Sequence, residues 1–488
     1  MAVASEEAAK KYKTLHPHRD RPLKHTPHGY WLEEAGTLES AAPLEQDRDA
    51  DVVVIGGGFT GLWAAWHITQ LQPDARVVLL EADEHCGRGP SGRNGGFCNV
   101  MWFSLPSMRR RWGDAAALAV AHASDRAVHE IGEFCEREEV DAWFRMGGYL
   151  QVSTAAAHDE VPSEAIAACR ELGALDAVQP LSPAEVAARC ASPAFRGGAF
   201  YPSSATVQPA RLALGLRDRL QARGVELFES TPVRALHDAP GGVEARTPSG
   251  TVRAGAAVVA IGGAATARHG PLRNRLTITS SHIVLTEPVP DLLEEIGWTG
   301  GECITDSRTM LHYFRTTPDG RIAFGLGGGR ISAGGRLRGK VEIDPEVVAR
   351  AAERLHAYFP GAEGRRITHA WGGPIDVSPT HLPVVVPLPG GRAFAAAGYT
   401  GNGVGPSHMV GRTLASLALD RHDDYSRLAI VDPSPQRVPP EPFHWLGGSA
   451  IHAGITHKEQ AEGEGRRPSM VASALAKVPE LIGFHIGR

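Results

Sequence analysis

Three glycines and one carboxylate near the beginning of the chain have the types and the spacing of a dinucleotide-binding site. Gly56, Gly58 and Gly61 fit the pattern G-x-G-x-x-G, and Glu81 follows twenty positions after the last glycine. In this pattern the first glycine permits a tight turn, the second lets a pyrophosphate approach the backbone, and the third allows close packing of helix on strand. The carboxylate would accept hydrogen bonds from ribose hydroxyls. A glycine-rich turn in an ordinary βαβ unit is the alternative interpretation.

These residues need a strand, a helix and a second strand to position them, and the sequence predicts all three. Residues 52–55 are a continuous β-branched run, as expected of a strand that is buried on both faces. Residues 62–71 predict a helix whose N-terminal N–H groups point at the phosphates. Residues 77–80 predict the second strand, which leads into Glu81. The complete unit favours a dinucleotide site over an ordinary turn.

Two further glycine-rich segments are suited to close contact with a flat or charged ligand. The loop 87–102 holds Ser91, Arg93 and Asn94 among its glycines, and such a loop can direct many N–H groups at an anion or a ring. Around 398–405 a second strand, glycine turn and helix would direct another helix dipole at a ligand. The charged edge of a reduced flavin ring is the natural candidate for this second turn.

Length and composition exclude several classes of protein. A chain of 488 residues is too long for one simple hydrophobic core. The formal charge of −5 and the scattered basic residues argue against a nucleic-acid partner. The six cysteines have no metal-binding spacing, which indicates reduced thiols, and we expect no metal site. Because neither a membrane-length apolar run nor a signal peptide is visible, we expect a soluble, cytoplasmic protein without a membrane partner.

Three motifs, in this order, resemble the FAD-dependent oxidoreductases of the D-amino-acid oxidase family. They are VVVIGGGFTGLWAAWHI from Val52, SGRNGG from Ser91, and WGGPID followed by AAAGYTGNGVG between Trp371 and Gly405. SGRNGG and WGGPID bring the chain closest to the γ-glutamylputrescine oxidase branch, beside sarcosine oxidase and glycine oxidase. The resemblance implies FAD rather than NAD as cofactor. It also implies hydride transfer from the carbon next to an amine to flavin N5.

The resemblance implies an α/β fold with two intertwined domains. One is a Rossmann-like FAD-binding domain, with three layers and a mostly parallel sheet, and the other is an α+β substrate domain on a mixed or antiparallel sheet. The alternating strand pattern of 276–287 is consistent with the second sheet. The expected boundaries are an N-terminal strap at 1–50, the FAD-binding domain at 51–110, 197–270 and 363–425, the substrate domain at 111–196 and 271–362, and a C-terminal wrapping tail at 426–488.

The resemblance also implies which residues hold the cofactor. The first motif and Glu81 would hold the ADP half, SGRNGG would line the pyrophosphate and the ring, and the last turn would lie at the pyrimidine edge. Val233 would offer its backbone to the adenine. The expected FAD-binding residues are Gly56, Gly58, Phe59, Thr60, Gly61, Glu81, Ala82, Ser91, Arg93, Asn94, Gly95, Gly96, Val233, Gly262, Gly398, Gly401, Asn402, Gly403 and Val404.

Four residues are candidates for contact with the substrate. Hydride transfer needs positioning rather than a strong base, so these candidates are binding residues. Arg315 lies near the position of an arginine that binds substrate carboxylate in relatives, with a surface arginine as the alternative. Tyr313 and Tyr399 would each shape an aromatic wall. His282 would face the ring or, alternatively, pack in the core.

Two departures from the family pattern leave the flavin linkage and the electron acceptor open. Sarcosine oxidases tether the flavin through a cysteine where this chain has His312, so non-covalent FAD is the default and a histidyl link the alternative. Those oxidases also use a lysine over the flavin to activate oxygen, and this chain has none between Lys24 and Lys340.

The expected function is FAD-dependent oxidation of a C–N bond in a small amine or N-substituted amino acid. Oxygen would be the electron acceptor and would give hydrogen peroxide. A flavin dehydrogenase that uses another acceptor, or a FAD-binding protein without turnover, are the alternatives.

Overall fold

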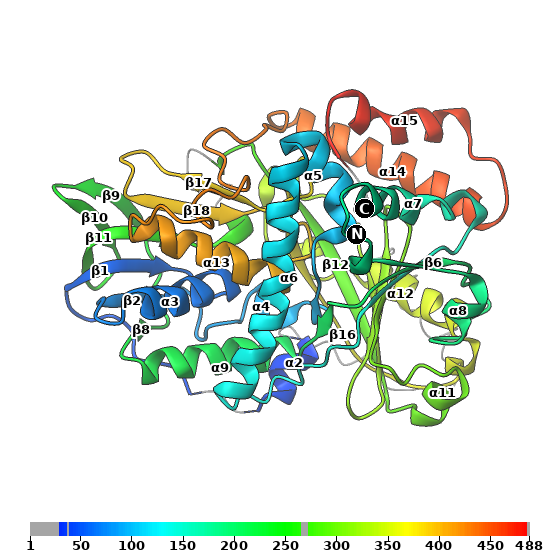
Figure 1. The fold of residues 1–488 in the computed structure, drawn as a ribbon, viewed down its shortest axis with the longest axis horizontal. Coiled ribbons are helices and arrows are strands. Elements are labelled where there is room, and N and C mark those ends of the chain that lie inside the picture. Colours follow the sequence, from blue (N-terminus) through cyan, green and yellow to red (C-terminus); the bar gives the residue numbers. More distant parts are fainter. Residues whose placement is uncertain (1–28, 37–38, 265–271, 486–488) are drawn as a thin grey trace.

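Two large sheets lie side by side in the computed structural model, which describes residues 29–36, 39–264 and 272–485 (Figure 1). The first sheet carries the glycine motif, and the second is the expected antiparallel sheet. The long helix α6 (Asp114–Arg137) crosses the molecule between them in this view (Figure 1). The fold is the expected α/β arrangement of a Rossmann-like domain and a second sheet domain.

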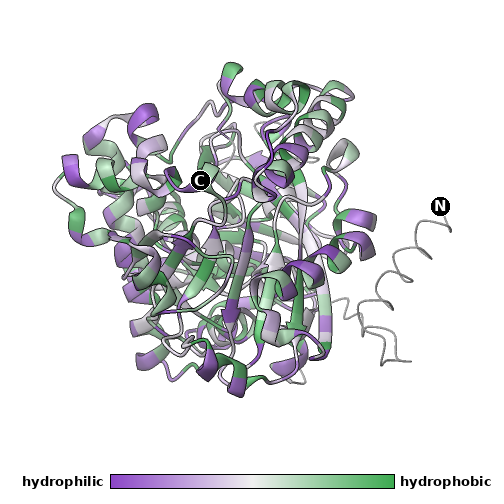
Figure 2. Ribbon diagram, turned by 90° about the vertical axis from the view of Figure 1, so that its right-hand side faces the viewer, coloured by the Kyte–Doolittle hydropathy of each residue, from purple (hydrophilic) through white to green (hydrophobic). Residues whose placement is uncertain are grey.

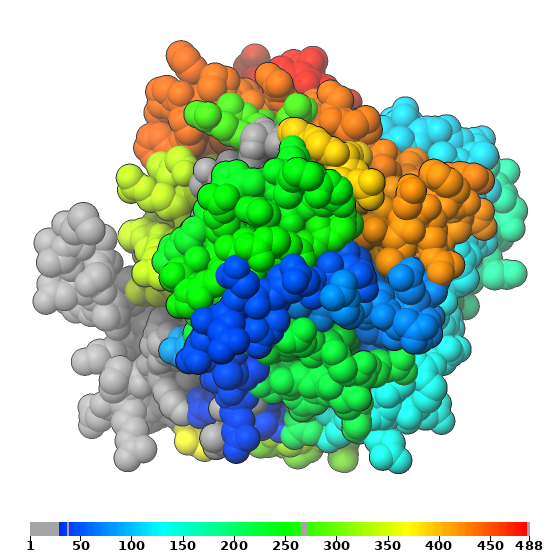
Figure 3. All heavy atoms as spheres, turned by 90° about the vertical axis from the view of Figure 1, so that its left-hand side faces the viewer, coloured from blue at the N-terminus to red at the C-terminus, as the bar shows by residue number. Residues whose placement is uncertain are grey.

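The first sheet is mostly parallel. Its strands, from edge to edge, are β17 (Val384–Pro387), β18 (Ala393–Ala397), β11 (Thr251–Val259), β1 (Arg48–Ile55), β2 (Val77–Leu80) and β8 (Glu226–Phe228), with β10 (Gly242–Arg246) paired to β11 and β9 (Ala235–Ala239) paired to β10. The pairs from β18 through β8 are parallel. Figure 3 shows segments from the early, middle and late parts of the chain meeting on one face of this domain, so its surface comes from three separate stretches of sequence.

The central strand β1 is buried on both faces, as its β-branched run predicts. Val52 and Val54 pack with the helices α3 (Phe59–Leu71) and α13 (Val404–Ala418), whereas Val53 and Ile55 pack on the opposite face. The two helices approach closely at Gly411, where a Cβ would lie 2.6 Å from the Cβ of Trp63. This packing brings the N-termini of both helices to the carboxyl edge of the parallel strands.

The second sheet is mixed and largely antiparallel. Its strands, in order, are β16 (Ile367–Val377), β12 (Thr277–Thr286), β15 (Ile322–Leu326), β14 (His312–Thr316), β13 (Cys303–Asp306), β4 (Tyr149–Val152), β6 (Gly198–Tyr201) and β5 (Gln179–Leu181). Only the β13–β4 pair of this sheet is parallel. One face packs on α12 (Pro345–Tyr358) through an apolar core that includes Phe314 and Phe324. Because β16 belongs here, residues 367–377 pair with this sheet, although we expected 363–425 to belong to the FAD-binding domain.

The remaining elements surround the two sheets. The helices are α2 (Gly29–Glu34), α4 (Pro90–Arg93), α5 (Leu105–Trp112), α7 (Val161–Glu171), α8 (Pro183–Ala187), α9 (Pro209–Ala222), α11 (Pro290–Glu295), α14 (Phe443–Gly463) and α15 (Met470–Leu481), and a small sheet pairs β3 (Phe97–Cys98) with β7 (Ala205–Thr206). The last two helices pack on each other at one end of the molecule (Figure 1). Figure 2, which views the molecule from the right-hand side of Figure 1, shows hydrophobic and hydrophilic residues mixed along the helices of the surface. No helix in the described part of the chain is long and apolar enough to cross a membrane.

Candidate active site

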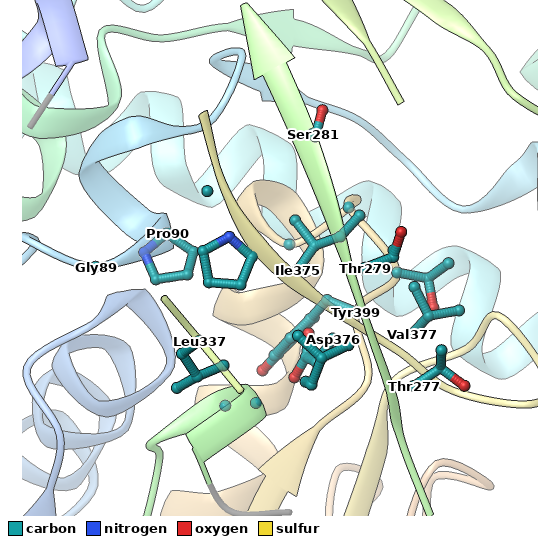
Figure 4. Close-up of a pocket in the computed structure, with 18 of the residues that line it drawn as sticks. Gly89, Pro90, Thr277, Thr279, Ser281, Leu337, Ile375, Asp376, Val377 and Tyr399 are labelled. Carbon is teal, nitrogen blue, oxygen red and sulfur yellow. The ribbon is translucent and has the colours of Figure 1, made fainter. Parts of the chain in front are cut away.

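A cavity of about 1740 Å³ connects the glycine motif of the first sheet with the second sheet and the C-terminal helices. It is larger than the roughly 300–1,000 Å³ that is typical of sites for drug-sized ligands. Its walls include the start of α3, the loop before β3, strands β12 and β16, and the turn before α13. Figure 4 shows part of it, with Pro90 on one side and Ile375, Asp376 and Tyr399 on the other.

The three glycines of the motif have the different roles that their order predicts. Gly56 has φ +109°, and a Cβ there would lie 2.5 Å from the carbonyl oxygen of Ala260. A Cβ on Gly61 would lie 1.9 Å from the carbonyl oxygen of Gly56, so the helix needs glycine to pack on its own turn. At Gly58, by contrast, a Cβ would meet only the Ser91 hydroxyl, at 3.0 Å. The space beside Gly58 is therefore left to a ligand.

The N-terminus of α3 opens into this space. Gly58 is its N-cap and has no side chain to satisfy the first N–H groups of the helix. Ser91 accepts one hydrogen bond, from the Phe59 N–H at 2.9 Å, and Phe59 and Thr60 line the cavity. Unpaired N–H groups and the helix dipole together favour an anion such as a pyrophosphate at this point.

The carboxylate of Glu81 lies beside the same turn. It directly follows β2, and it accepts hydrogen bonds from the Gly57 N–H at 2.6 Å and the Asp83 N–H at 2.7 Å. Burial raises the pKa of Glu81 above its usual value. The two N–H donors hold the carboxylate at the cavity wall, where its remaining lone pairs can accept from ribose hydroxyls.

The SGRNGG loop is held in shape by its own asparagine and by two tryptophans. The Asn94 side chain donates to the Ser91 carbonyl at 2.8 Å and accepts from the Gly96 N–H at 2.7 Å. Trp31 donates to the Asn94 carbonyl, and Trp371 donates to the Arg93 carbonyl, each at 2.8 Å. These four hydrogen bonds thus fix the shape of the loop.

The Arg93 guanidinium lines the cavity. Its Nε donates to the Gly89 carbonyl at 3.3 Å, and burial lowers its pKa from the ordinary value. The guanidinium lies against Gly373 of β16, where a Cβ would be 3.6 Å from the Arg93 Cζ. A partly buried cation in this position can pair with an anionic part of a ligand.

The second glycine turn closes the opposite wall. Gly398 donates its N–H to the Asp376 carboxylate at 2.9 Å, and the Tyr399 hydroxyl lies 2.6 Å from the Thr60 hydroxyl of α3. The following helix begins at Val404 with Gly403 as N-cap and has no side-chain cap. Two helix N-termini, one from each turn, therefore open into the same cavity.

Asp376 is a cavity residue that our sequence analysis did not single out, although it lies in the quoted WGGPID motif. Its carboxylate lines the cavity beside the second turn, and enclosure raises its pKa. The only sequence signal for Asp376 is a carboxylate about twenty residues before a glycine turn. This spacing becomes informative only when the pairing of β16 with β12 is known.

Most of the expected cofactor residues meet at the cavity. Those that line it are Gly56, Gly58, Phe59, Thr60, Glu81, Ala82, Ser91, Arg93, Asn94, Gly95, Val233, Gly262, Gly401, Asn402, Gly403 and Val404. Gly61, Gly96 and Gly398 are not among the lining residues. Each of these three serves the packing of a turn: Gly61 in α3, Gly96 against the Val207 carbonyl, and Gly398 against Ser378.

The strand β14 divides the substrate candidates by its alternation. Tyr313 lines the cavity, its hydroxyl lies 2.6 Å from the Ser281 hydroxyl of β12, and burial raises its pKa to about 12. Tyr399 also lines the cavity. His312 directly precedes Tyr313 on β14 and is buried on the opposite face of the strand. Its Nδ1 lies 2.6 Å from the Asp306 carboxylate. A flavin linkage through His312 would require the ring to leave this pair.

Arg315 is buried away from the cavity, contrary to its expected role as a ligand of substrate carboxylate. Its guanidinium donates to the carbonyls of Gly96, Val207 and Thr316, and it is 2% exposed. Burial lowers its pKa to about 10. Arg315 and Tyr313 alternate along β14, but Arg315 lies beyond the cavity, against residues 96 and 207 that flank the small β3–β7 sheet.

His282 also points away from the cavity. It is fully buried, and its Nε2 accepts a hydrogen bond from the Asp344 N–H at 2.9 Å. Its neighbours Ser281 and Ile283 line the cavity instead, as the alternation of a strand requires. The core alternative for His282 is therefore the one that the structure supports.

Comparison with known proteins agrees with this geometry. The model of the family described as FAD dependent oxidoreductase matches residues 51–417. The chain belongs to this family. Its cofactor is FAD, and the family's usual non-covalent binding agrees with the position of His312.

The individual relatives have low sequence identity to this chain, but the matches cover most of their length. A probable oxidoreductase OrdL from Rhizobium meliloti is 27% identical over 78% of this chain and 86% of its own length. Gamma-glutamylputrescine oxidoreductase from Escherichia coli is 27% identical over 82% of this chain and 91% of its own length. The solved glycine oxidase from Geobacillus kaustophilus has a TM-score of 0.65, covering 80% of this chain and all of that one, at 20% identity. At that identity the structural likeness supports the fold alone.

The residues present fit FAD. The open space at Gly58, the N-terminus of α3 and Glu81 suit an ADP moiety, and Arg93 with the second turn suits a flavin ring. When bound, FAD supplies a hydride acceptor. The residues of this chain would hold the ring in position.

Proposed function

We propose that this protein is an enzyme that oxidises a C–N bond of a small amine or N-substituted amino acid with FAD. The observation that carries this proposal is the continuity of the cavity. It extends from the glycine motif past the second turn to the hydroxyls of Tyr313 and Ser281, and so leaves space for a small molecule beyond the cofactor.

The relatives support this choice of substrate. One of them is named gamma-glutamylputrescine oxidoreductase and another glycine oxidase, the latter from Bacillus licheniformis at 24% identity over 93% of its length. Matches to proteins named L-2-hydroxyglutarate dehydrogenase cover only 41% of this chain in the longest cases. The full-length matches thus favour an amine donor over a hydroxy acid.

The residues at the substrate end would bind and orient the amine. The Tyr313 and Ser281 hydroxyls form a pair that can donate to, or accept from, an uncharged amine nitrogen. Their strands also exclude water, because Ile283 and Leu311 line the cavity beside them. An uncharged amine is the form that can lose a hydride, and an apolar enclosure favours it.

Oxygen is the electron acceptor that we propose, with hydrogen peroxide as product. No lysine lies among the described residues that line the cavity, so oxygen activation through lysine has no candidate there. Lys340 is directed towards Glu346 on the surface, with 3.9 Å between Nζ and the carboxylate.

All six cysteines are reduced thiols, which fits an enzyme of the cytoplasm.

Anaerobic flavin reduction tests the proposal. Purified holoenzyme is mixed, without oxygen, with primary amines, secondary amines and amino acids, and loss of flavin absorbance is followed. Bleaching by at least one amine is the expected result, followed by peroxide formation when oxygen is admitted. Flavin that no amine bleaches would contradict the proposal and favour a FAD-binding protein without turnover. Bleaching without reoxidation by oxygen would assign a dehydrogenase that uses another acceptor.

A further inference from the structure

The helix α14 lies outside the family match and yet forms a wall of the cavity. The match ends at residue 417, and α14 begins at Phe443. Seven of its residues line the cavity: Phe443, His444, Gly447, Gly448, Ile451, His452 and Ile455. They recur at intervals of three and four, so one face of the helix meets the cavity along about three turns.

Three polar contacts hold this face against the second sheet. His444 Nε2 lies 2.8 Å from the Thr277 hydroxyl, and His452 Nε2 lies 2.5 Å from the Gly328 carbonyl oxygen, to which it donates. In the third contact, the Glu459 side chain accepts hydrogen bonds from the loop at Thr309 and Met310. The helix is thus fastened near its beginning, middle and end.

Glu459 fixes a cavity loop as well as the helix. Its buried carboxylate accepts from the Thr309 N–H at 2.5 Å and from the Met310 N–H at 3.2 Å, and its carbonyl accepts from Arg308 at 2.9 Å. Thr309 and Met310 themselves line the cavity. A carboxylate that bonds two backbone N–H groups leaves the loop little freedom, so the tail helix and this loop form one rigid wall.

The wall is apolar where the helix meets the loop. Ile451 and Ile455 of α14 line it, and Met310, Leu311 and Ile331 line it from the second domain. Gly448 permits the approach of the two sides, because a Cβ there would lie 3.0 Å from Ile331 Cδ1. Ile451 is half-buried and Ile455 is buried, as expected of side chains that border an enclosed space.

The charged groups of the cavity lie elsewhere. Among the described lining residues they are Glu81, Asp83, Glu84, Arg88, Arg93, Arg234, Arg338, Glu342 and Asp376. None belongs to α14 or to the lining segments 309–313 and 327–331. Arg315, the expected partner of a substrate carboxylate, is bound to backbone carbonyls outside the cavity. Burial lowers the pKa values of His444 and His452, the two histidines of α14 that line the cavity, and so favours their neutral forms.

We propose that α14 makes the substrate end selective for amines that carry an uncharged apolar substituent. This inference rests on the amine oxidation proposed above. The substituent would lie between Ile451 and Ile455 on one side and Met310 and Leu311 on the other. A carboxylate in the same place would lose its hydration without gaining a cation, which is unfavourable.

A homologous series of substrates tests the inference on wild-type holoenzyme. Linear alkylamines from propylamine to hexylamine are compared with ω-amino acids of the same chain length, by the rate of anaerobic flavin reduction at low substrate concentration. Each added methylene should raise the apparent second-order rate constant of the alkylamines about fourfold, which is about 0.8 kcal/mol of apolar burial converted at room temperature. The ω-amino acids should be at least tenfold slower at equal length.

Two variants of the same helix locate the effect. Ile451→Asn places an amide on the cavity side and should reduce the increase per methylene to less than twofold. Leu446→Asn is the matched control, because Leu446 is 54% exposed and does not line the cavity, and it should keep the wild-type increase. Flavin absorbance and the melting temperature show that each variant is folded and loaded. If Ile451→Asn does not fold, Ile451→Ala should lower the increase at the longest amines.

The outcomes separate this inference from the proposed function. Alkylamine rates without dependence on length, ω-amino acids that react as fast as alkylamines, or a folded Ile451→Asn variant with the wild-type increase would each overturn it, while amine oxidation would still stand. Flavin that neither series bleaches, and that no other amine bleaches, would instead refute the amine oxidation on which it rests.

Discussion

The two ends of the cavity differ in the chain segments and in the chemical groups that form them. At the glycine-motif end, one stretch from Asp51 to Glu81 supplies the strand, turn, helix and acid, and it acts mainly through backbone groups. At the substrate end, the wall comes from β12, β14, the loop at 309–311 and α14, which lie far apart in the sequence and act through side chains. The first end depends on local backbone geometry, and the second depends on strand register and on how the tail docks.

The same contrast separates the two arginines of the site. Arg93 lies in the local SGRNGG loop and lines the cavity, as expected. Arg315 lies on a strand and is directed by its register into a cluster of carbonyls. A charged residue near a binding site is therefore informative only when the element that carries it is short and its neighbours fix its direction. The following predictions test this contrast between the two ends, beginning with the largest effect.

Gly58→Val should abolish FAD retention. The valine side chain would occupy the space that Gly58 leaves beside Ser91, where the pyrophosphate approaches the backbone. Purified protein should lack the absorbance at about 450 nm that oxidised flavins have in general. The unfolding midpoint should match that of wild-type apoprotein, because no packed atom lies there except the Ser91 hydroxyl. Full flavin loading of the variant would show that this end is not built around the glycine turn.

Arg315→Met should destabilise the fold by about 1–3 kcal/mol, because it removes the donor to the buried carbonyl of Val207 and one of the two donors to the carbonyl of Gly96. Urea unfolding measures this change. Arg246→Met is the control, since Arg246 is an exposed partner of Glu244, and should change stability by less than about 0.5 kcal/mol. An unaltered stability together with a tenfold increase in KM for an acidic amine would return Arg315 to the substrate site.

Acid should destabilise the end of the molecule that holds the motif, through His67 of α3. Burial lowers the pKa of His67 to about 3, below the value of about 6.5 in the unfolded chain. Between those values the unfolded state binds a proton that the folded state does not, so the unfolding free energy falls by about 1.4 kcal/mol per pH unit as the pH decreases.

Replacement of His67 tests this pH dependence. His67→Gln should flatten the stability profile between pH 6.5 and pH 5 by about 1 kcal/mol per pH unit, measured by urea unfolding. His444→Gln in the tail should have less effect, because that histidine is less enclosed. Equal effects of the two substitutions would mean that the two ends do not differ in acid sensitivity.

Ser281→Ala should have the smallest effect and should be confined to the substrate end. It removes the hydroxyl that lies 2.6 Å from the Tyr313 hydroxyl. Loss of one such hydrogen bond corresponds to about a threefold to tenfold increase in KM for the amine, with FAD content unchanged. Tyr313→Phe should act similarly, and the double variant should be no worse than either, because both remove the same bond. Additive effects would show that the two hydroxyls contact the substrate separately.

The sequence alone predicted the architecture of the glycine-motif end because the relevant interactions are local. The β-branched run 52–55 predicts a strand buried on both faces, and the glycine spacing predicts which position needs an open approach. Sixteen of the nineteen expected cofactor residues line the cavity, and the three that do not are glycines that let turns pack. The two sheet types were predictable for the same reason, since hydrophobic periodicity is set within each element.

The tertiary structure alone decided the substrate end. Whether Tyr313 or His312 faces the cavity depends on strand register, since a shift of one residue exchanges the two faces. Whether Arg315 reaches a ligand depends on the carbonyls that surround it. The role of α14 depends on long-range contacts, such as Glu459 with the N–H groups of Thr309 and Met310, which no local pattern records. Local geometry thus determined the end of the cavity that fits FAD, and the packing of distant segments determined the end at which we propose that the substrate binds.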